Sequence, residues 1–135
     1  MANEIKQAQQ SPRLENGTLY WYYGDSVKID FKFDITIYGN AYSLGENDYA
    51  IIEVFNNKGI PFNTYASNNT NSNIVTASED SNILVVSFTL TPTNSLTFKP
   101  TQYKYNIRLV RGVGEEGSEV YYKDTLINQN TIIVE

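Results

Sequence analysis

Three glycines in the last quarter of the chain have the spacing of a phosphate-binding loop. Gly112, Gly114 and Gly117 occur in "RGVGEEGSEVYY" in the order G-x-G-x-x-G. A dinucleotide-binding loop needs a helix after it, because the helix N-terminus supplies the amide donors for the pyrophosphate. The residues that follow are tyrosine-rich and β-branched, which favours a strand, and two glutamates within the loop would repel a phosphate. We therefore expect these glycines to form the turn of a β-hairpin.

Acidic side chains are the next candidates for chemistry, because two carboxylates are enough for glycoside hydrolysis. Asp30 and Asp34 would share one face of an extended chain, but Lys28 and Lys32 alternate with them. Such a charge-balanced face is typical of a strand surface in contact with water. We therefore do not expect catalysis there.

Calcium binding is also weakly supported. The stretches at 45–48 and 79–80 could offer carboxylate and amide oxygens, but neither has the alternating aspartates of a dedicated calcium loop. The 135 residues include no histidine and no cysteine, which removes Ser-His-Asp triads, thiol nucleophiles and the usual zinc ligands. We assign no catalytic, cofactor-binding or metal-binding residue and predict that the chain is not an enzyme.

The charge and the hydropathy pattern argue against nucleic-acid and membrane partners. A net charge of -5 and a pI of about 4.7 argue against a nucleic-acid surface, which needs clustered lysine and arginine. No stretch approaches the roughly 18 consecutive apolar residues of a membrane span, and the first residues lack the apolar core of a secretion signal. We expect protein partners and synthesis in a cytoplasm.

The aromatic run at 20–23 is the main candidate for binding. Tyr20, Trp21, Tyr22 and Tyr23 are consecutive, so in a strand Tyr20 and Tyr22 would lie on one face and the other two on the opposite face. Aromatic side chains are favoured at protein interfaces and can also stack on sugars. Core packing, a protein interface and carbohydrate binding all stay open, and we take these four residues as the candidate interface.

Alternating patterns place these residues on strands. Residues 27–37 alternate strictly between apolar and polar side chains, and residues 83–90 and 103–110 repeat the pattern. Shorter strands are expected at 19–23, 49–55, 60–65, 73–78, 119–127 and 130–134, and no interval has a helical period. The sequence predicts an all-β, immunoglobulin-like antiparallel β-sandwich of about seven to nine strands over 17–135, with a polar N-terminal arm at 1–16.

Tyr103 is expected to have a structural role. It lies near the start of a predicted strand, after Pro100. In immunoglobulin-like sandwiches a tyrosine at this place closes a corner by bonding its hydroxyl back to nearby backbone.

Three segments together resemble a known family. "YYGDSVKIDFKFDI", "YSLGENDYAIIEVFN" and "VSFTLTPTNSLTFKPTQYKYNIRLV" resemble, in order and spacing, the immunoglobulin-like N-terminal domains of phage upper baseplate proteins and related tail and particle proteins. The likeness covers residues 20–134, and it departs from the family at Pro100-Thr101-Gln102, where a glycine is usual.

The resemblance implies a virion structural protein of a bacteriophage. Such a protein would be made in the bacterial host cytoplasm and built into a baseplate, tail or capsid surface. Its partners would be other virion proteins and copies of itself. The alternative is a carbohydrate-binding or adhesive module, in which exposed aromatic residues stack on glycan.

Overall fold

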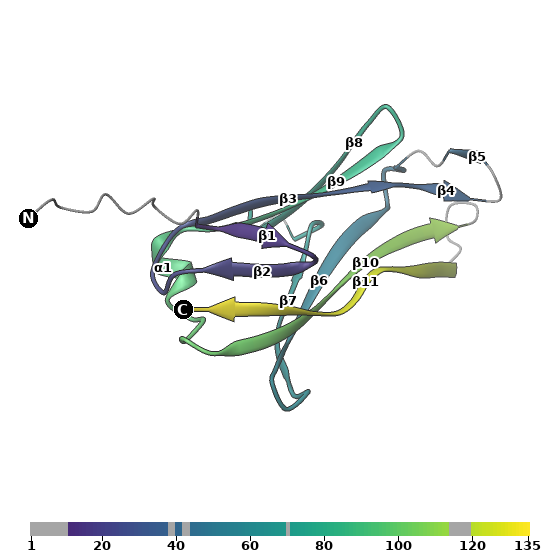
Figure 1. Ribbon diagram of the computed structural model, residues 1–135. Helices are drawn as coiled ribbons and strands as arrows, with labels where there is room; N and C mark the ends of the chain where they lie inside the picture. Colours follow the sequence, from purple (N-terminus) through teal and green to yellow (C-terminus); the bar gives the residue numbers. More distant parts are fainter. Residues whose placement is uncertain (1–10, 38–39, 42–43, 70, 114–119) are drawn as a thin grey trace, which may run out of the picture.

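The computed structural model describes residues 11–37, 40–41, 44–69, 71–113 and 120–135 as a sandwich of two β-sheets (Figure 1). The larger sheet has six strands, in the order β1 (Arg13–Glu15), β2 (Thr18–Trp21), β11 (Val120–Val134), β10 (Gln102–Val113), β6 (Tyr49–Asn56) and β7 (Pro61–Ala66). The smaller sheet has three strands, in the order β3 (Val27–Asp34), β9 (Ile83–Leu90) and β8 (Val75–Asp80). The other elements are a short β4–β5 pair (Thr36–Ile37 and Asn40–Ala41) and the one-turn helix α1 (Pro92–Ser95).

The predicted all-β sandwich is confirmed, and its strand order is that of the immunoglobulin-like class. Strands β3, β9 and β8 take the places of strands B, E and D, and β6, β10 and β11 take those of C, F and G. The pairing departs from a purely antiparallel sandwich at one place, because β2 runs parallel to β11. The strand that would pair with β3 in an ordinary four-stranded sheet has therefore joined the other sheet.

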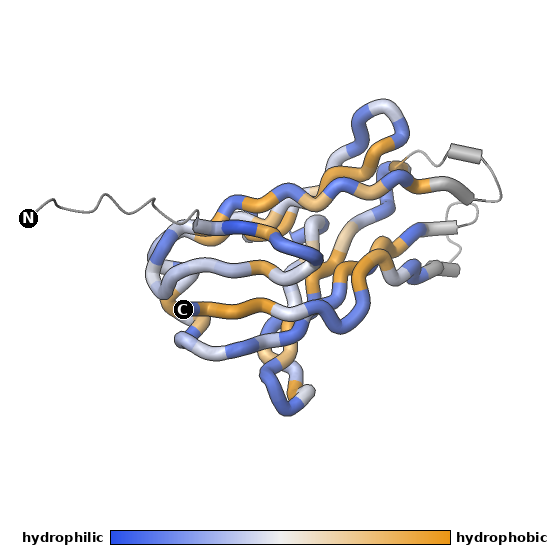
Figure 2. Tube along the Cα trace, viewed as in Figure 1, coloured by the Kyte–Doolittle hydropathy of each residue, from blue (hydrophilic) through white to orange (hydrophobic). Residues whose placement is uncertain are grey.

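The alternation read from the sequence explains how the two sheets pack. In β9 the buried residues are Leu84, Val86, Phe88 and Leu90, at every second position. In β3 the inward residues are apolar, while the outward ones are charged and exposed. Figure 2 shows hydrophobic residues along β9, β10 and β11 and hydrophilic residues in the β8–β9 and β6–β7 turns. Burial of this apolar face is the main term that stabilises the sandwich.

Aromatic rings fill the core beside α1. The Trp21 ring lies 5.2 Å from that of Phe98 and 6.4 Å from that of Phe88. Tyr103 and Phe62 contact Phe98 in turn, at 5.3 Å and 5.1 Å between ring centroids. These tilted and edge-on contacts are the geometries that aromatic pairs prefer.

One short helix accompanies the strands: α1 is a single turn, in a chain where no interval shows a helical period. Thr91 is its N-cap: the side-chain oxygen accepts a hydrogen bond from the Asn94 amide at 3.1 Å, and Pro92 occupies the first helical position. Both are helix-start signals. A single turn contains too few residues to show a helical period.

The predicted arm is wrong at its C-terminal end. Residues 13–15, within the predicted 1–16 segment, form β1, with Leu14 paired to Leu19 and Glu15 to Thr18. Gly17, with a φ of +82°, makes the tight turn between β1 and β2. Residues 1–10 lie outside the described residues.

Other boundaries also differ from the sequence prediction: the strand expected at 27–37 divides into β3 and β4, and β2 ends at Trp21, before the end of the expected 19–23 strand. The strands expected at 119–127 and 130–134 are parts of one strand, β11. The interruption is a bulge in the β10–β11 pairing, where Gln129 has a φ of +57° and its amide donates to the Asn106 side chain at 2.8 Å. The buried Asn106 satisfies the backbone that the bulge frees.

Candidate functional site

The aromatic run at 20–23 divides between the core and the surface. Trp21 is only 1% exposed and belongs to the hydrophobic core. Its place in the candidate interface is therefore a correction: the side chain cannot stack on a glycan or a partner, because Phe88 and Phe98 cover it. The strand alternation puts Leu19 and Trp21 inward, so Tyr20 lies on the outer face. Tyr22 follows the end of β2, and the side chains of Tyr20 and Tyr22 are both partly buried.

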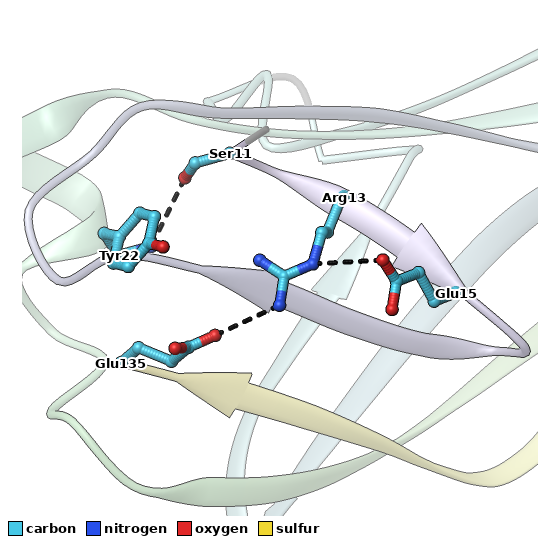
Figure 3. Close-up of polar contacts among 5 residues, drawn as sticks. All are labelled: Ser11, Arg13, Glu15, Tyr22 and Glu135. Carbon is cyan, nitrogen blue, oxygen red and sulfur yellow. Dashed lines mark hydrogen bonds and ion pairs between the residues drawn. The ribbon is translucent and has the colours of Figure 1, made fainter. Parts of the chain in front are cut away.

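The outer face of β1 and β2 is held by a chain of charged and aromatic contacts. The Arg13 guanidinium lies over the Tyr20 ring, 4.2 Å from the centroid. As Figure 3 shows, the same side chain forms ion pairs with Glu15 at 3.3 Å and with Glu135, beside the end of β11, at 3.4 Å. Because the Arg13 side chain is 14% exposed, these contacts fix its position better than a fully exposed ion pair would. The Arg13 side chain is therefore held in place before any partner binds.

The next two tyrosines extend this surface toward α1. The Tyr22 amide donates to the Ser11 hydroxyl at 3.3 Å (Figure 3). Tyr23 is 40% exposed, and the Lys99 ammonium lies 5.6 Å from its ring centroid and 3.4 Å from its hydroxyl. Leu96, just after α1, is 44% exposed and lies near Gly24. This end of the sandwich therefore presents apolar surface next to cations.

We call this region the β2–α1 surface and define it by seven residues: Arg13, Tyr20, Tyr22, Tyr23, Leu96, Lys99 and Glu135. The C-terminal end of β11 lies on the α1 side of the sandwich in Figure 1. Large exposed apolar side chains beside aromatic and arginine groups are the composition of protein interfaces.

Tyr105 holds the β1–β2 hairpin against the larger sheet. Its hydroxyl donates to the Gly17 backbone carbonyl at 2.7 Å, although the two residues are 88 positions apart. Burial raises the pKa of Tyr105 to about 12, and a hydrogen bond with the Asn130 side chain partly offsets this effect. The contact places the turn at residues 16–17 and with it the outer face of β2.

Tyr103 makes the corner contact expected from the sequence. Its hydroxyl donates to the Lys99 backbone carbonyl, four residues upstream, at 3.2 Å. Burial raises its pKa, and the bond to Lys99 partly offsets the rise. Burial likewise raises the pKa of Tyr65, against the effect of a bond with the Asn63 side chain. Burial in the packed sandwich is the first cause of all three shifts.

The glycine motif and the Asp30–Asp34 pair lie on strands or between them. Gly114 and Gly117 lie outside the described residues, but the segment after them is the strand β11 and not a helix. Asp30 and Asp34 are exposed on β3, and Asp30 accepts a bond from Ser87 at 2.6 Å. Without a helix after the glycines, the requirement for a dinucleotide loop is not met.

In the acidic stretches considered for calcium, at 45–48 and 79–80, two carboxylates accept hydrogen bonds from backbone amides. The Asp48 carboxylate accepts from the Gly45 amide at 2.7 Å, and the Glu79 carboxylate accepts from the Leu44 amide at 2.9 Å. Across the described residues, no three His, Cys, Asp or Glu side chains come close enough together to hold a metal ion.

Open hollows are lined by residues of the described surface. One of about 390 Å³ is lined mainly by amide and hydroxyl side chains, from Asn71, Ser72, Asn73, Ile74, Thr89, Thr91 and Asn94. One of about 310 Å³ is lined by Glu46, Asn47, Asp48, Tyr49 and Asn68. The first could hydrogen-bond sugar hydroxyls but has no aromatic face for stacking.

No protein-family model and no curated protein matches this sequence. Over the part of the chain that the structure describes, no helix is both long and apolar enough to cross a membrane.

Sequence reasoning found the tyrosines of the β2–α1 surface but not their neighbours. The sequence pattern places Arg13 in the polar arm, and Leu96 and Lys99 follow α1, a helix too short to show a period. The T-P-x-N start of α1 was the one available signal. The contact of Arg13 with Glu135 spans 122 positions, so nothing local in the sequence indicates it.

Proposed function

We propose that this protein is a non-enzymatic structural component of a bacteriophage particle that acts by binding other particle proteins. The single observation that supports binding is the β2–α1 surface, where Tyr23 and Leu96 expose apolar area beside ordered cations. The phage assignment is supported by the sequence resemblance to upper baseplate proteins and related particle proteins. The particle would be assembled in the cytoplasm of the bacterial host.

The rigid sandwich supports a role in assembly. A module in a particle must keep its shape so that its neighbours are held in fixed positions. Two closely packed sheets with an aromatic core are rigid enough for this role. The ordering of Arg13 between Tyr20 and Glu135 lowers the entropic cost of binding, because the side chain is already held before the partner arrives.

The test is replacement of the exposed apolar side chains. Tyr23→Ser with Leu96→Ser removes both from the surface and leaves the buried Trp21 in place. We expect the double variant to fold with wild-type stability and to be incorporated into particles at a reduced copy number. The matched control is Ile60→Ser, which removes another exposed apolar side chain, in the β6–β7 turn away from α1 (Figure 1).

The outcome separates the hypotheses clearly. Reduced incorporation of the double variant with normal incorporation of the control supports the β2–α1 surface as the contact. Normal incorporation of both variants would contradict it and move the contact to another face of the sandwich.

A second candidate function is carbohydrate binding, favoured by the amide- and hydroxyl-lined hollow beside Ile74. Since Trp21 is buried, its fluorescence cannot report directly on a glycan there. Chemical-shift changes of Asn71 and Asn94 on addition of glycan are the suitable measurement. Shifts confined to the hollow would favour this second function over assembly.

A further inference from the structure

The outer edge of β3 is unpaired in the described structure. In immunoglobulin-like sandwiches strand A can pair with strand B, the place that β3 occupies here. In this chain β2 pairs with β11 instead, and among the described residues β3 pairs only with β9. β3 has eight residues and no proline. It therefore presents a long row of backbone donors and acceptors that can bind another strand.

Apolar side chains beside this edge are incompletely covered. Strand β8 contacts β6 and β7, so the order of the smaller sheet puts β3 toward the β1–β2 side of the larger one. Ile29 and Phe33 point inward from β3 but are only partly buried. Leu14 pairs with the buried Leu19 and so shares its inner face, yet it is 41% exposed. The inner face of the larger sheet therefore extends beyond β3, the edge strand of the smaller sheet.

The solvent face of β3 has an alternating charge pattern. Lys28, Asp30, Lys32 and Asp34 are all exposed. Within the described part of the chain, Lys28, Lys32 and Asp34 form no ion pair, and Asp30 accepts one hydrogen bond, from Ser87. These charges are therefore available to a partner strand.

We propose that β3 pairs antiparallel with β3 of a second copy of this chain, with Phe31 opposite Phe31 on a two-fold axis. The two smaller sheets then form one continuous sheet of six strands. Ile29 lies opposite Phe33 of the second copy, so the partly buried side chains cover each other. The second strand also extends the smaller sheet over the side where Leu14 is exposed.

The charges specify this register. Lys28 lies opposite Asp34 of the second copy, and Asp30 lies opposite Lys32. The two-fold axis repeats each pair, so four attractive cross-strand pairs form over the full length of the strand. The chain is thus complementary to itself in this one arrangement.

Neighbouring registers are disfavoured. A shift of two residues in one direction puts Lys28 opposite Lys32 and Asp30 opposite itself. The same shift in the other direction puts Asp30 opposite Asp34 and Lys32 opposite itself. A shift of one residue places inward apolar residues opposite outward charged ones, which breaks the inner face. A partner strand without this alternation would not gain the four pairs.

The pairing is tested in solution, independently of where the protein works. Sedimentation equilibrium of the full chain, up to about millimolar concentration, is expected to show a monomer–dimer equilibrium. Asp34→Lys places lysines opposite Lys28 at two positions, and we expect the dimer Kd to rise about tenfold or more. The charge swap Lys28→Asp with Asp34→Lys restores both pairs and should restore the dimer. Asp80→Lys, on the opposite edge of the same sheet, is the control with the same charge change.

Mixtures of variants test the register itself. Asp34→Lys and Lys28→Asp chains should each self-associate poorly but pair with each other, because every opposing pair is then of opposite sign. Asp34→Lys mixed with Lys32→Asp has the same net charges but leaves one lysine pair and one aspartate pair. That mixture should not associate above the level of the single variants.

Several results would overturn the proposal. One is a wild-type chain that stays monomeric, which would mean that the charges protect the edge from association. Another is a dimer that responds equally to Asp34→Lys and Asp80→Lys, which would place the contact elsewhere. A third is a dimer that forms only after residues 1–10 are removed, which would assign the β3 edge to that segment.

Discussion

The hydrogen bond from Tyr105 to the β1–β2 turn can be tested by a single-atom change, Tyr105→Phe. The hydroxyl donates to the Gly17 carbonyl at 2.7 Å, and a neutral hydrogen bond contributes about 1 kcal/mol net to stability. Because Gly17 is only partly buried, water can reach the carbonyl and little further penalty is added. We expect a loss of about 1 kcal/mol, which for a chain of this size lowers Tm by about 3–5 °C.

The pH dependence of the same variant gives a second, independent check. In the folded protein the pKa of Tyr105 is raised from 10.0 to about 12, so the neutral hydroxyl is favoured in the folded state. Its contribution to stability is complete below the unfolded pKa and is lost as the pH rises from 10.0 to about 12. The stability difference between wild type and Tyr105→Phe should therefore shrink over this range.

Urea denaturation followed by the fluorescence of the single tryptophan measures both effects. Tyr20→Phe is the control, because it removes a partly exposed hydroxyl from β2 and should change the unfolding free energy by less than about 0.5 kcal/mol. A Tyr105→Phe protein as stable as wild type would refute the anchoring role. A difference that stays constant to high pH would refute the assigned pKa shift.

The remaining predictions concern the core and the surface. Trp21→Ala should destabilise the fold by about 3–5 kcal/mol, since it empties the aromatic core, and chemical denaturation will measure the loss. Acrylamide should quench the Trp21 fluorescence only weakly in the folded protein and strongly in urea, because the indole is covered. Tyr23→Ser with Leu96→Ser should change the unfolding free energy by less than about 0.5 kcal/mol per site, measured by the same denaturation. Removal of residues 1–10 should leave Tm unchanged, because the segment is polar and has little apolar surface to bury, whereas removal of 1–16 also removes β1 and should lower Tm.

The sequence predicted the strands that bury one face and missed the elements without a period. The alternation in 27–34 and 83–90 identified β3 and β9 because side-chain direction in a strand follows directly from position. Three residues, as in β1, or a single turn, as in α1, are too short to show alternation or helical spacing. These elements are recognised only by their caps and pairing partners.

The candidate site was predictable only in part, for a related reason. The run at 20–23 indicated aromatic binding surface, but the choice of inward face depends on whether Leu19 or Tyr20 packs against the opposite sheet. The apolar Leu19 decided it, and so Trp21 entered the core. The contacts of Arg13 with Glu135 and of Tyr105 with Gly17 join distant parts of the chain and depend on the tertiary fold.

Quantitative mass spectrometry of purified particles from the source tests the central claim most directly. If the protein is a structural component of a phage particle, the chain will be present at a fixed copy number relative to the major capsid protein in every preparation. Absence of the chain from particles, with the protein found free or on cells, would contradict the account and favour the carbohydrate-binding function.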